Sequence, residues 1–256
     1  MNLINTHSHV YAEQFEVDRI DVVNRAIENG VSKILLPDID STYREKVIAL
    51  SQQFPKVCYP MFGIHPTSIK ENFKEELMLL EQSLKQYRVI AIGEIGIDLY
   101  WDKTFLFQQI EAFVYQMQLA NQYKLPVVIH VRDAFDEIFV ALKSLNEKKF
   151  FGVFHCFSGN VDEAIKAIDL GFMLGIGGVL TYKKSGLEEV VKDIPIEHIV
   201  LETDDPWLSP VPFRGKRNEP SYLIHIAQKL AEIKNCSVEE IARITTQNAE
   251  KLFKIN

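Results

Sequence analysis

Two histidines separated by a single residue lie near the start of the chain, in the segment Thr6-His7-Ser8-His9. If this segment ends a β-strand, the alternation of side chains points both imidazoles to the same face. Two imidazoles placed in this way can bind one metal ion. The motif alone is also compatible with a polar strand end, so a metal site requires further ligands.

Four more side chains of the metal-binding type close or follow short apolar runs, namely Glu94, His130, His155 and Asp204. Four imidazoles and two carboxylates gathered in one place would be a poor structural core, because buried charge requires compensation. Two divalent cations would supply it, with Glu94 as the bridging carboxylate. Mg²⁺, Mn²⁺ and Zn²⁺ all remain compatible, since imidazoles suit zinc and carboxylates suit the harder ions.

The elements that must position these side chains alternate between short apolar runs and longer segments of helical periodicity. Eight strands are expected, at Asn2–Val10, Lys33–Leu36, Val57–Gly63, Val89–Ile95, Pro126–His130, Phe150–Cys156, Phe172–Ile176 and Ile199–Glu202. Helices are expected between them, among them Thr42–Gln53, Glu75–Gln86, Lys103–Tyr123 and Ser221–Ile233, with an additional C-terminal helix at Ser237–Lys254.

This order predicts an α/β fold, a (β/α)₈ TIM barrel of the usual length for that architecture, as one domain spanning residues 1–256. A doubly wound open sheet is the alternative, but it normally has a glycine-rich phosphate turn after its first strand. Here the first strand ends in His-x-His. In a barrel the carboxyl ends of all strands meet at one face, so the six expected ligands would converge there.

Composition limits the function classes. The formal net charge of −7 argues against a positively charged coat that grips duplex DNA, although a metal site can supply positive charge locally. No basic segment followed by an apolar stretch opens the chain, and the three cysteines form no C-x-x-C motif. We therefore expect a cytoplasmic protein without membrane association and without an obligate protein partner.

Several segments, in order along the chain, resemble the signatures of the TatD family of metal-dependent deoxyribonucleases. They are residues 4–9 (Ile-Asn-Thr-His-Ser-His), 93–98 (Gly-Glu-Ile-Gly-Ile-Asp), 126–132 (Pro-Val-Val-Ile-His-Val-Arg), 155–159 (His-Cys-Phe-Ser-Gly), 201–208 (Leu-Glu-Thr-Asp-Asp-Pro-Trp-Leu) and 214–220 (Arg-Gly-Lys-Arg-Asn-Glu-Pro). The resemblance implies one metal bound by His7, His9, Glu94 and Asp204, and a second bound by Glu94, His130 and His155.

The chain departs from the usual family pattern at two places. Asn5 stands where the family usually has Asp, and Val10-Tyr11 follows the second histidine where the family usually has Leu-Asp or similar. Asn5 cannot supply a negative charge, so the groups behind His7 are expected to differ from the family pattern.

The chemistry expected from this site is phosphodiester hydrolysis, by a hydroxide activated between two divalent metals. Asp204 would take the proton of the attacking water and Glu94 would bridge the metals. Arg132 would hold phosphate through its forked guanidinium, or would instead form a structural salt bridge. His65, in Gly63-Ile64-His65-Pro66, would contact substrate or form a loop hydrogen bond.

The segment after the last strand combines aromatic and basic residues, which suits single-stranded nucleic acid. Its candidate substrate-binding residues are Trp207, Arg214, Lys216 and Arg217, with Tyr100, Trp101, Tyr182 and Lys183 as a possible extension. The alternative is that these aromatic residues pack the top of the barrel.

The predicted activity is therefore that of a 3′-5′ exonuclease on single-stranded or frayed DNA, with DNA as the partner. A metal-dependent hydrolase of a small amide, lactone or phosphoester is the alternative, because the same barrel supports many chemistries. A non-catalytic scaffold that retains the barrel is a third reading, and it conflicts with the presence of all six ligands.

Overall fold

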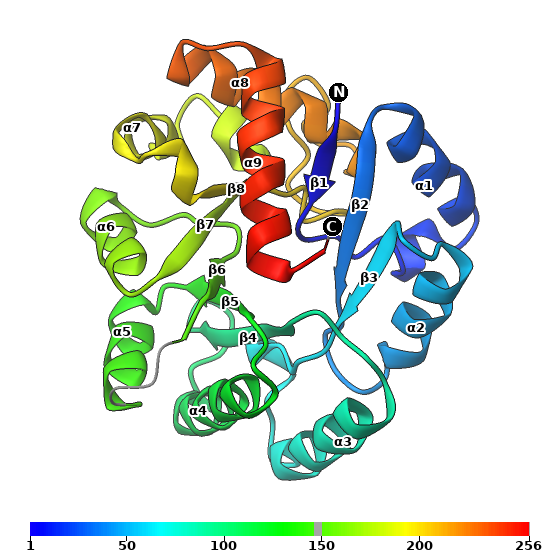
Figure 1. Cartoon of the computed structure of the whole chain (residues 1–256). Helices are drawn as coiled ribbons and strands as arrows, with labels where there is room; N and C mark the ends of the chain where they lie inside the picture. The colour runs from blue at the N-terminus through cyan, green and yellow to red at the C-terminus, as the bar shows by residue number, and fades with distance from the viewer. Residues whose placement is uncertain (146–149, 256) are drawn as a thin grey trace.

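The computed structural model describes residues 1–145 and 150–255, and eight parallel strands form its centre (Figure 1). They pair in two sheets, in the orders β1-β2-β3 and β4-β5-β6-β7-β8. Their bounds are β1 (Leu3–Asn5), β2 (Val31–Pro37), β3 (Cys58–Met61), β4 (Ile92–Asp98), β5 (Val127–Arg132), β6 (Gly152–Phe154), β7 (Phe172–Ile176) and β8 (Ile199–Leu201).

Backbone hydrogen bonds join the two sheets at both seams. Between β3 and β4, the Gly93 N–H donates to the carbonyl oxygen of Phe62 over 2.9 Å. Between β8 and β1, the Thr6 N–H donates to the carbonyl oxygen of Leu201 over 3.0 Å. These hydrogen bonds do not form a continuous strand ladder, but they connect the two sheets at both junctions. The α/β TIM barrel predicted from the sequence is confirmed.

Helices surround the strands on the outside (Figure 1). They are α1 (Arg19–Glu28), α2 (Arg44–Gln53), α3 (Phe73–Gln86), α4 (Leu106–Tyr123), α5 (Phe135–Ser144), α6 (Val161–Asp169), α7 (Leu187–Asp193), α8 (Leu223–Lys234) and α9 (Val238–Phe253). Short 3₁₀ turns lie between them, at η1 (Glu13–Phe15), η2 (Pro66–Ser68), η3 (Gly178–Thr181), η4 (Ile196–His198) and η5 (Pro220–Tyr222).

Local sequence sets several of these helix ends. Asn160 and Glu163 form a capping box at the start of α6, in which each side chain accepts a backbone N–H of the other residue. The Ser237 side chain accepts the Glu240 N–H at the start of α9. The predicted helix at Lys103 begins only at Leu106, after a turn in which Asp102 accepts the Thr104 N–H.

The additional C-terminal helix α9 lies across the ring of strands in Figure 1. Its apolar residues Ala249, Leu252 and Phe253 pack against side chains from inside the barrel, including Leu35 and Val128. These partners belong to the amino-terminal half of the barrel, so α9 closes that end. The carboxyl ends of the strands remain open at the opposite face.

The first strand is shorter than expected, ending at Asn5 instead of Val10. Its ladder with β2 ends at the pair Asn5–Ile34, although β2 itself continues to Pro37. Residues 6–10 continue as an irregular loop, held where the Ser8 N–H donates to the Leu35 carbonyl and the His9 N–H to the Asp205 carbonyl. Among the helices of the described residues, none is long and apolar enough to cross a membrane.

Candidate metal centre

All six predicted ligands meet at the carboxyl ends of the strands, around the carboxylate of Glu94. Glu94 Oε2 lies 3.2 Å from His7 Nε2 and 3.6 Å from His9 Nε2. Its other oxygen, Oε1, lies 2.7 Å from His155 Nε2 and 2.8 Å from His130 Nδ1. Each carboxylate oxygen therefore faces a different pair of imidazoles, which is the arrangement required of a bridging ligand.

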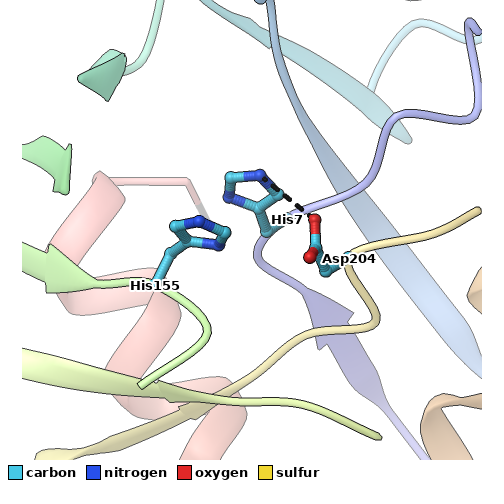
Figure 2. Close-up of side chains that lie close together, drawn as sticks. All are labelled: His7, His155 and Asp204. Carbon is cyan, nitrogen blue, oxygen red and sulfur yellow. Dashed lines mark ion pairs between the residues drawn. The ribbon is translucent and has the colours of Figure 1, made fainter. Parts of the chain in front are cut away.

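Asp204 approaches the same cluster from the segment that follows β8. Its Oδ1 lies 3.8 Å from His7 Nε2 and 3.6 Å from His9 Nε2. Figure 2 shows this carboxylate beside His7, whose ring stacks on His155 with centroids 3.9 Å apart. The backbone of Asp204 is in the left-handed region, with φ of +56°, a conformation that Asp adopts more readily than most residues.

A cavity of about 460 Å³ opens over this cluster. Five of the six predicted ligands line it, and the sixth, His7, is fully buried beneath them. Its volume lies within the range of about 300–1,000 Å³ that is usual for small-molecule sites. The ligands are therefore open to solutes on one side and held by the barrel on the other.

The nitrogen and oxygen atoms in the cluster match the donors that divalent metals prefer. Three sets of side chains each offer ligand atoms within 4.8 Å of one another: His7, His9 and Glu94; His7, His155 and Asp204; and His65, Glu94 and His130. His7 Nε2 and His9 Nε2 are only 3.0 Å apart, so two lone pairs converge on the same space. The residues present thus fit a metal centre.

Electrostatics point the same way. Burial acts to raise the pKa of Glu94, but the neighbouring His155, His65 and His7 outweigh it, and the pKa lies well below its ordinary value. Burial lowers the pKa of His155, but Glu94 and then Glu202 outweigh it and raise that pKa well above the ordinary value. Without metal, protons on imidazoles supply the positive charge that the ionised carboxylates require.

The whole chain, residues 4–254, matches the family model of TatD-related DNases. The chain belongs to the TatD family of metal-dependent hydrolases. A protein of Bacillus subtilis named as the uncharacterized metal-dependent hydrolase YabD is 38% identical over 99% of this chain and its own full length.

Two further proteins are similar to this chain. A protein of Erwinia tasmaniensis named as the 3′-5′ ssDNA/RNA exonuclease TatD is 34% identical, over 94% of this chain and 96% of its own. The crystal structure of YjjV, a TatD homologue of Escherichia coli K12, superposes with a TM-score of 0.93. It is 31% identical and covers 99% of this chain and 98% of the other.

In this TatD-family site, two of the histidines have a further carboxylate beside the ring nitrogen that faces away from Glu94. Asp98 Oδ2 lies 3.0 Å from His130 Nε2, and Glu202 Oε1 lies 3.4 Å from His155 Nδ1. Such partners fix the orientation of an imidazole and raise its basicity as a metal ligand. Glu202 is fully buried, and a Cβ on Gly175 would overlap its carboxylate, so this position has room only for glycine.

The Nδ1 atom of His9 contacts a neutral group, the hydroxyl of Tyr11. The Tyr11 hydroxyl donates to the Pro37 carbonyl over 2.6 Å, so its oxygen is left to accept the His9 Nδ1–H over 2.7 Å. The free Nε2 lone pair of His9 then points into the cluster. Tyr11 thus takes up a place for which the usual family pattern has a carboxylate.

Within the part of the chain that the structure describes, His7 has neither a carboxylate nor a hydroxyl beside the outer nitrogen of its ring, in agreement with the expectation drawn from Asn5. The Asn5 side chain pairs with Thr203, donating from Nδ2 to Oγ1 over 2.7 Å and accepting the backbone N–H over 3.0 Å. It does not reach the His7 ring, and His7 Nδ1 has no hydrogen-bond partner among the described residues. Asp205 joins this network by accepting from the Thr203 hydroxyl, and its other carboxylate oxygen accepts from the Ser8 hydroxyl. Burial raises the pKa of Asp205 to about 7.

Sequence reasoning assigned no role to Tyr11, Asp98 or Glu202. Strand alternation contained the signal, because residues two or four apart in an extended chain share a face. Tyr11 lies two residues after His9, Asp98 four after Glu94, and Glu202 two before Asp204.

His65 and Arg132 both lie in the cavity. His65 Nδ1 accepts the Thr67 N–H over 3.1 Å, and its Nε2 lies 3.3 Å from Glu94 Oε1. The expected loop hydrogen bond is therefore present, and Nε2 faces the cluster, while contact with substrate stays a prediction. Arg132 forms no ion pair with any described residue, and its guanidinium stacks 3.7 Å from the centroid of the Tyr100 ring. The structure thus disfavours the salt-bridge alternative.

The candidate substrate-binding segment after β8 is only partly in reach of the cavity. Trp207 lines it, and its ring lies 5.2 Å from that of His9. Arg217 instead forms a two-pronged ion pair with Asp18, and Arg214 stacks over Tyr182. The side chain of Lys216 is exposed to solvent, near the Phe213 ring. Of the four residues, only Trp207 is among those that line the cavity.

Proposed function

We propose that the protein hydrolyses phosphodiester bonds of single-stranded DNA, as a 3′-5′ exonuclease, with two bound divalent cations. One observation carries the proposal: the unpaired guanidinium of Arg132 opens into the same cavity as five of the ligands. A planar, forked cation beside a metal centre matches the geometry of a phosphate group. The name of the Erwinia relative supports the same substrate class.

The proposed ligand sets follow the distances. His7, His9, Glu94 and Asp204 would hold one cation, and Glu94, His130 and His155 would hold the other. Bound there, Mg²⁺, Mn²⁺ or Zn²⁺ would lower the pKa of a water molecule and neutralise charge on the phosphoryl oxygens.

Asp204 is suited to take the proton of the attacking water. Its side chain is 14% exposed, against 3% for Glu94, so it is the more open of the two carboxylates. Burial opposes ionisation, but the neighbouring His9, His155 and His7 hold the pKa of Asp204 below its ordinary value. It is therefore an ionised acceptor at neutral pH.

Two further side chains would orient the phosphate. Arg132 would donate from both arms of its guanidinium to non-bridging oxygens. His65 is neutral, because burial is the largest of the effects that lower its pKa. Since the Thr67 N–H donates to its Nδ1, its ring proton is on Nε2, which faces the cluster and would donate to the phosphoryl group.

The activity can be tested with single-stranded oligonucleotides labelled at the 5′ end, incubated with Mg²⁺ or Mn²⁺. We expect shortening by single nucleotides from the 3′ end, with little loss from a strand blocked at that end. His130→Ala should abolish the release, while His225→Ala, at a half-buried position of α8 that does not line the cavity, should not. Turnover of small amides, lactones or phosphoesters without any release from DNA would overturn the proposal in favour of a small-molecule hydrolase.

A further inference from the structure

A second cavity of about 270 Å³ adjoins the one over the metal ligands. We call it the side cavity; among its lining residues are Thr67, Lys70, Asp98, Trp101, Asp102 and Phe105. Three of these residues, Thr67, Asp98 and Trp101, also line the central cavity. A chain that crosses the metal ligands can therefore continue directly into the side cavity.

Aromatic rings and a cation line the side cavity. Trp101 is 69% exposed and lines both cavities, so much of its ring surface is free to stack on a ligand. Lys70 Nζ lies 5.1 Å above the Phe105 ring and 3.8 Å from Asp102. Both members of that ion pair are nearly half exposed, so the pair is weak and Lys70 can exchange its partner for a phosphate.

The carboxylate of Asp98 does not repel an anion here, because its charge is already engaged. Its Oδ2 is paired with His130, and its Oδ1 accepts the backbone N–H groups of Tyr100 and Trp101. One side chain thus fixes both a metal ligand and the turn that carries Trp101. Asp98 therefore fixes the position of the side cavity relative to the metal ligands.

The volume fits one planar ring system, since it falls just below the usual range of about 300–1,000 Å³ for drug-sized ligands. Bases stack on aromatic side chains with little dependence on sequence, and cations beside the rings follow the phosphates. Trp207, which also lines the cavity over the metal ligands, offers a second exposed ring.

We propose that the side cavity binds one nucleotide adjacent to the scissile phosphate, with its base stacked on Trp101 and its phosphate near Lys70. This assignment rests on the proposed nuclease function. It makes Trp101 a substrate-binding residue for single strands, and its contribution appears only with substrates that have at least two linked nucleotides.

The test compares Trp101→Ala with a matched control, Phe107→Ala, whose ring is 82% exposed on α4 and lines neither cavity. With oligothymidylate, Trp101→Ala should raise KM about tenfold, within the range for loss of one stacked base. With bis(p-nitrophenyl) phosphate, which has no second nucleotide, its kcat/KM should equal that of the parent. Phe107→Ala should match the parent on both substrates.

A strand with an abasic residue next to the scissile phosphate supplies the reciprocal perturbation. The parent should lose about the same factor on this strand, and Trp101→Ala should lose nothing further. An unchanged KM on oligothymidylate, or an equal loss on both substrates, would overturn the assignment.

Binding can be read separately from catalysis. The chain has two tryptophans, so Trp207→Phe leaves Trp101 as the sole indole reporter. Oligothymidylate should quench its fluorescence without added metal. Quenching without metal, followed by no hydrolysis once Mg²⁺ or Mn²⁺ is added, would refute the nuclease function and keep the binding site. Hydrolysis with metal but no quenching would refute the side-cavity assignment alone.

Discussion

Replacing Glu202 by Gln isolates the effect of a single buried charge on the metal centre. Glu202 Oε1 accepts the Cys156 N–H and lies 3.4 Å from His155 Nδ1. Its other oxygen faces the Thr6 hydroxyl, which also donates to the Leu201 carbonyl. A glutamine with its oxygen in the Oε1 position keeps the acceptor, and its amide can donate to Thr6.

The size of the effect follows from what the substitution retains. Changes behind a metal-binding histidine typically weaken metal affinity by about 10- to 100-fold. Because the acceptor and the shape survive in Glu202→Gln, we expect the low end, about tenfold or about 1.4 kcal/mol. Glu202→Ala would leave the Cys156 N–H without an acceptor and would remove the carboxylate that lies 3.4 Å from His155 Nδ1, so the larger figure applies there.

Proton competition gives this prediction a pH signature. Burial lowers the pKa of His155, but Glu94 and then Glu202 raise it well above the ordinary value. A raised pKa keeps the proton on the ring to higher pH, where it competes with metal. Glu202→Gln lowers that pKa, so it should release fewer protons on binding metal, and its affinity deficit should shrink as pH falls.

The assay is calorimetric titration of Mn²⁺ into the metal-free protein, across a pH series and in two buffers of different ionisation enthalpy. Glu188→Gln is the matched control, since Glu188 is an exposed residue of α7 paired with Lys229. Equal Mn²⁺ affinity for Glu202→Gln and the parent at alkaline pH would refute the reasoning. So would an unchanged number of released protons.

Four further outcomes follow from the same geometry. Tyr11→Phe removes the acceptor for the His9 Nδ1–H, so Mn²⁺ affinity in calorimetry should fall about tenfold. Arg132→Lys loses the forked contact to phosphate, so kcat/KM on single-stranded DNA should fall about 10- to 100-fold at unchanged Mn²⁺ affinity. Arg217→Ala breaks a partly exposed ion pair away from the cavity, so kcat/KM should hold and denaturant unfolding should show a loss below about 1 kcal/mol. Because carboxylates overcome burial and raise the pKa of His155, Mn²⁺ affinity in a calorimetric pH series should keep rising past the ordinary histidine range.

Each of these outcomes has a clear opposite. Parent-like Mn²⁺ affinity in Tyr11→Phe would show that the phenol does not position His9. Weakened Mn²⁺ binding in Arg132→Lys would place that residue in the metal centre instead of on the phosphate. A large fall in kcat/KM for Arg217→Ala would return that residue to the substrate path. Affinity that levels off at the ordinary histidine pKa would contradict the charge distribution around Glu94.

The barrel and the ligand set were predictable because their signals are local. Each ligand was expected at or just after the end of an apolar run. This holds for Asp204 after β8, whereas Glu94 is the third residue of β4, which runs from Ile92 to Asp98. In a parallel barrel, that position alone places a side chain on the common face. No long-range contact had to be known.

What failed depended on contacts between distant segments. Residues 6–10 were expected to extend β1, but they leave the ladder with β2, and the His9 N–H instead donates to the Asp205 carbonyl of a distant segment. The substrate role expected for Arg217 did not account for Asp18, which lies 199 residues away in the chain and pairs with it. The side cavity was likewise invisible, because it forms between the loop that carries Trp101 and the η2 turn.

A crystal structure of the protein soaked in Mn²⁺, read by anomalous scattering, tests the central claim most directly. The geometry predicts two ions bridged by Glu94, one near His7, His9 and Asp204 and the other near His130 and His155. Anomalous peaks elsewhere, or ions that do not contact Glu94, would contradict it.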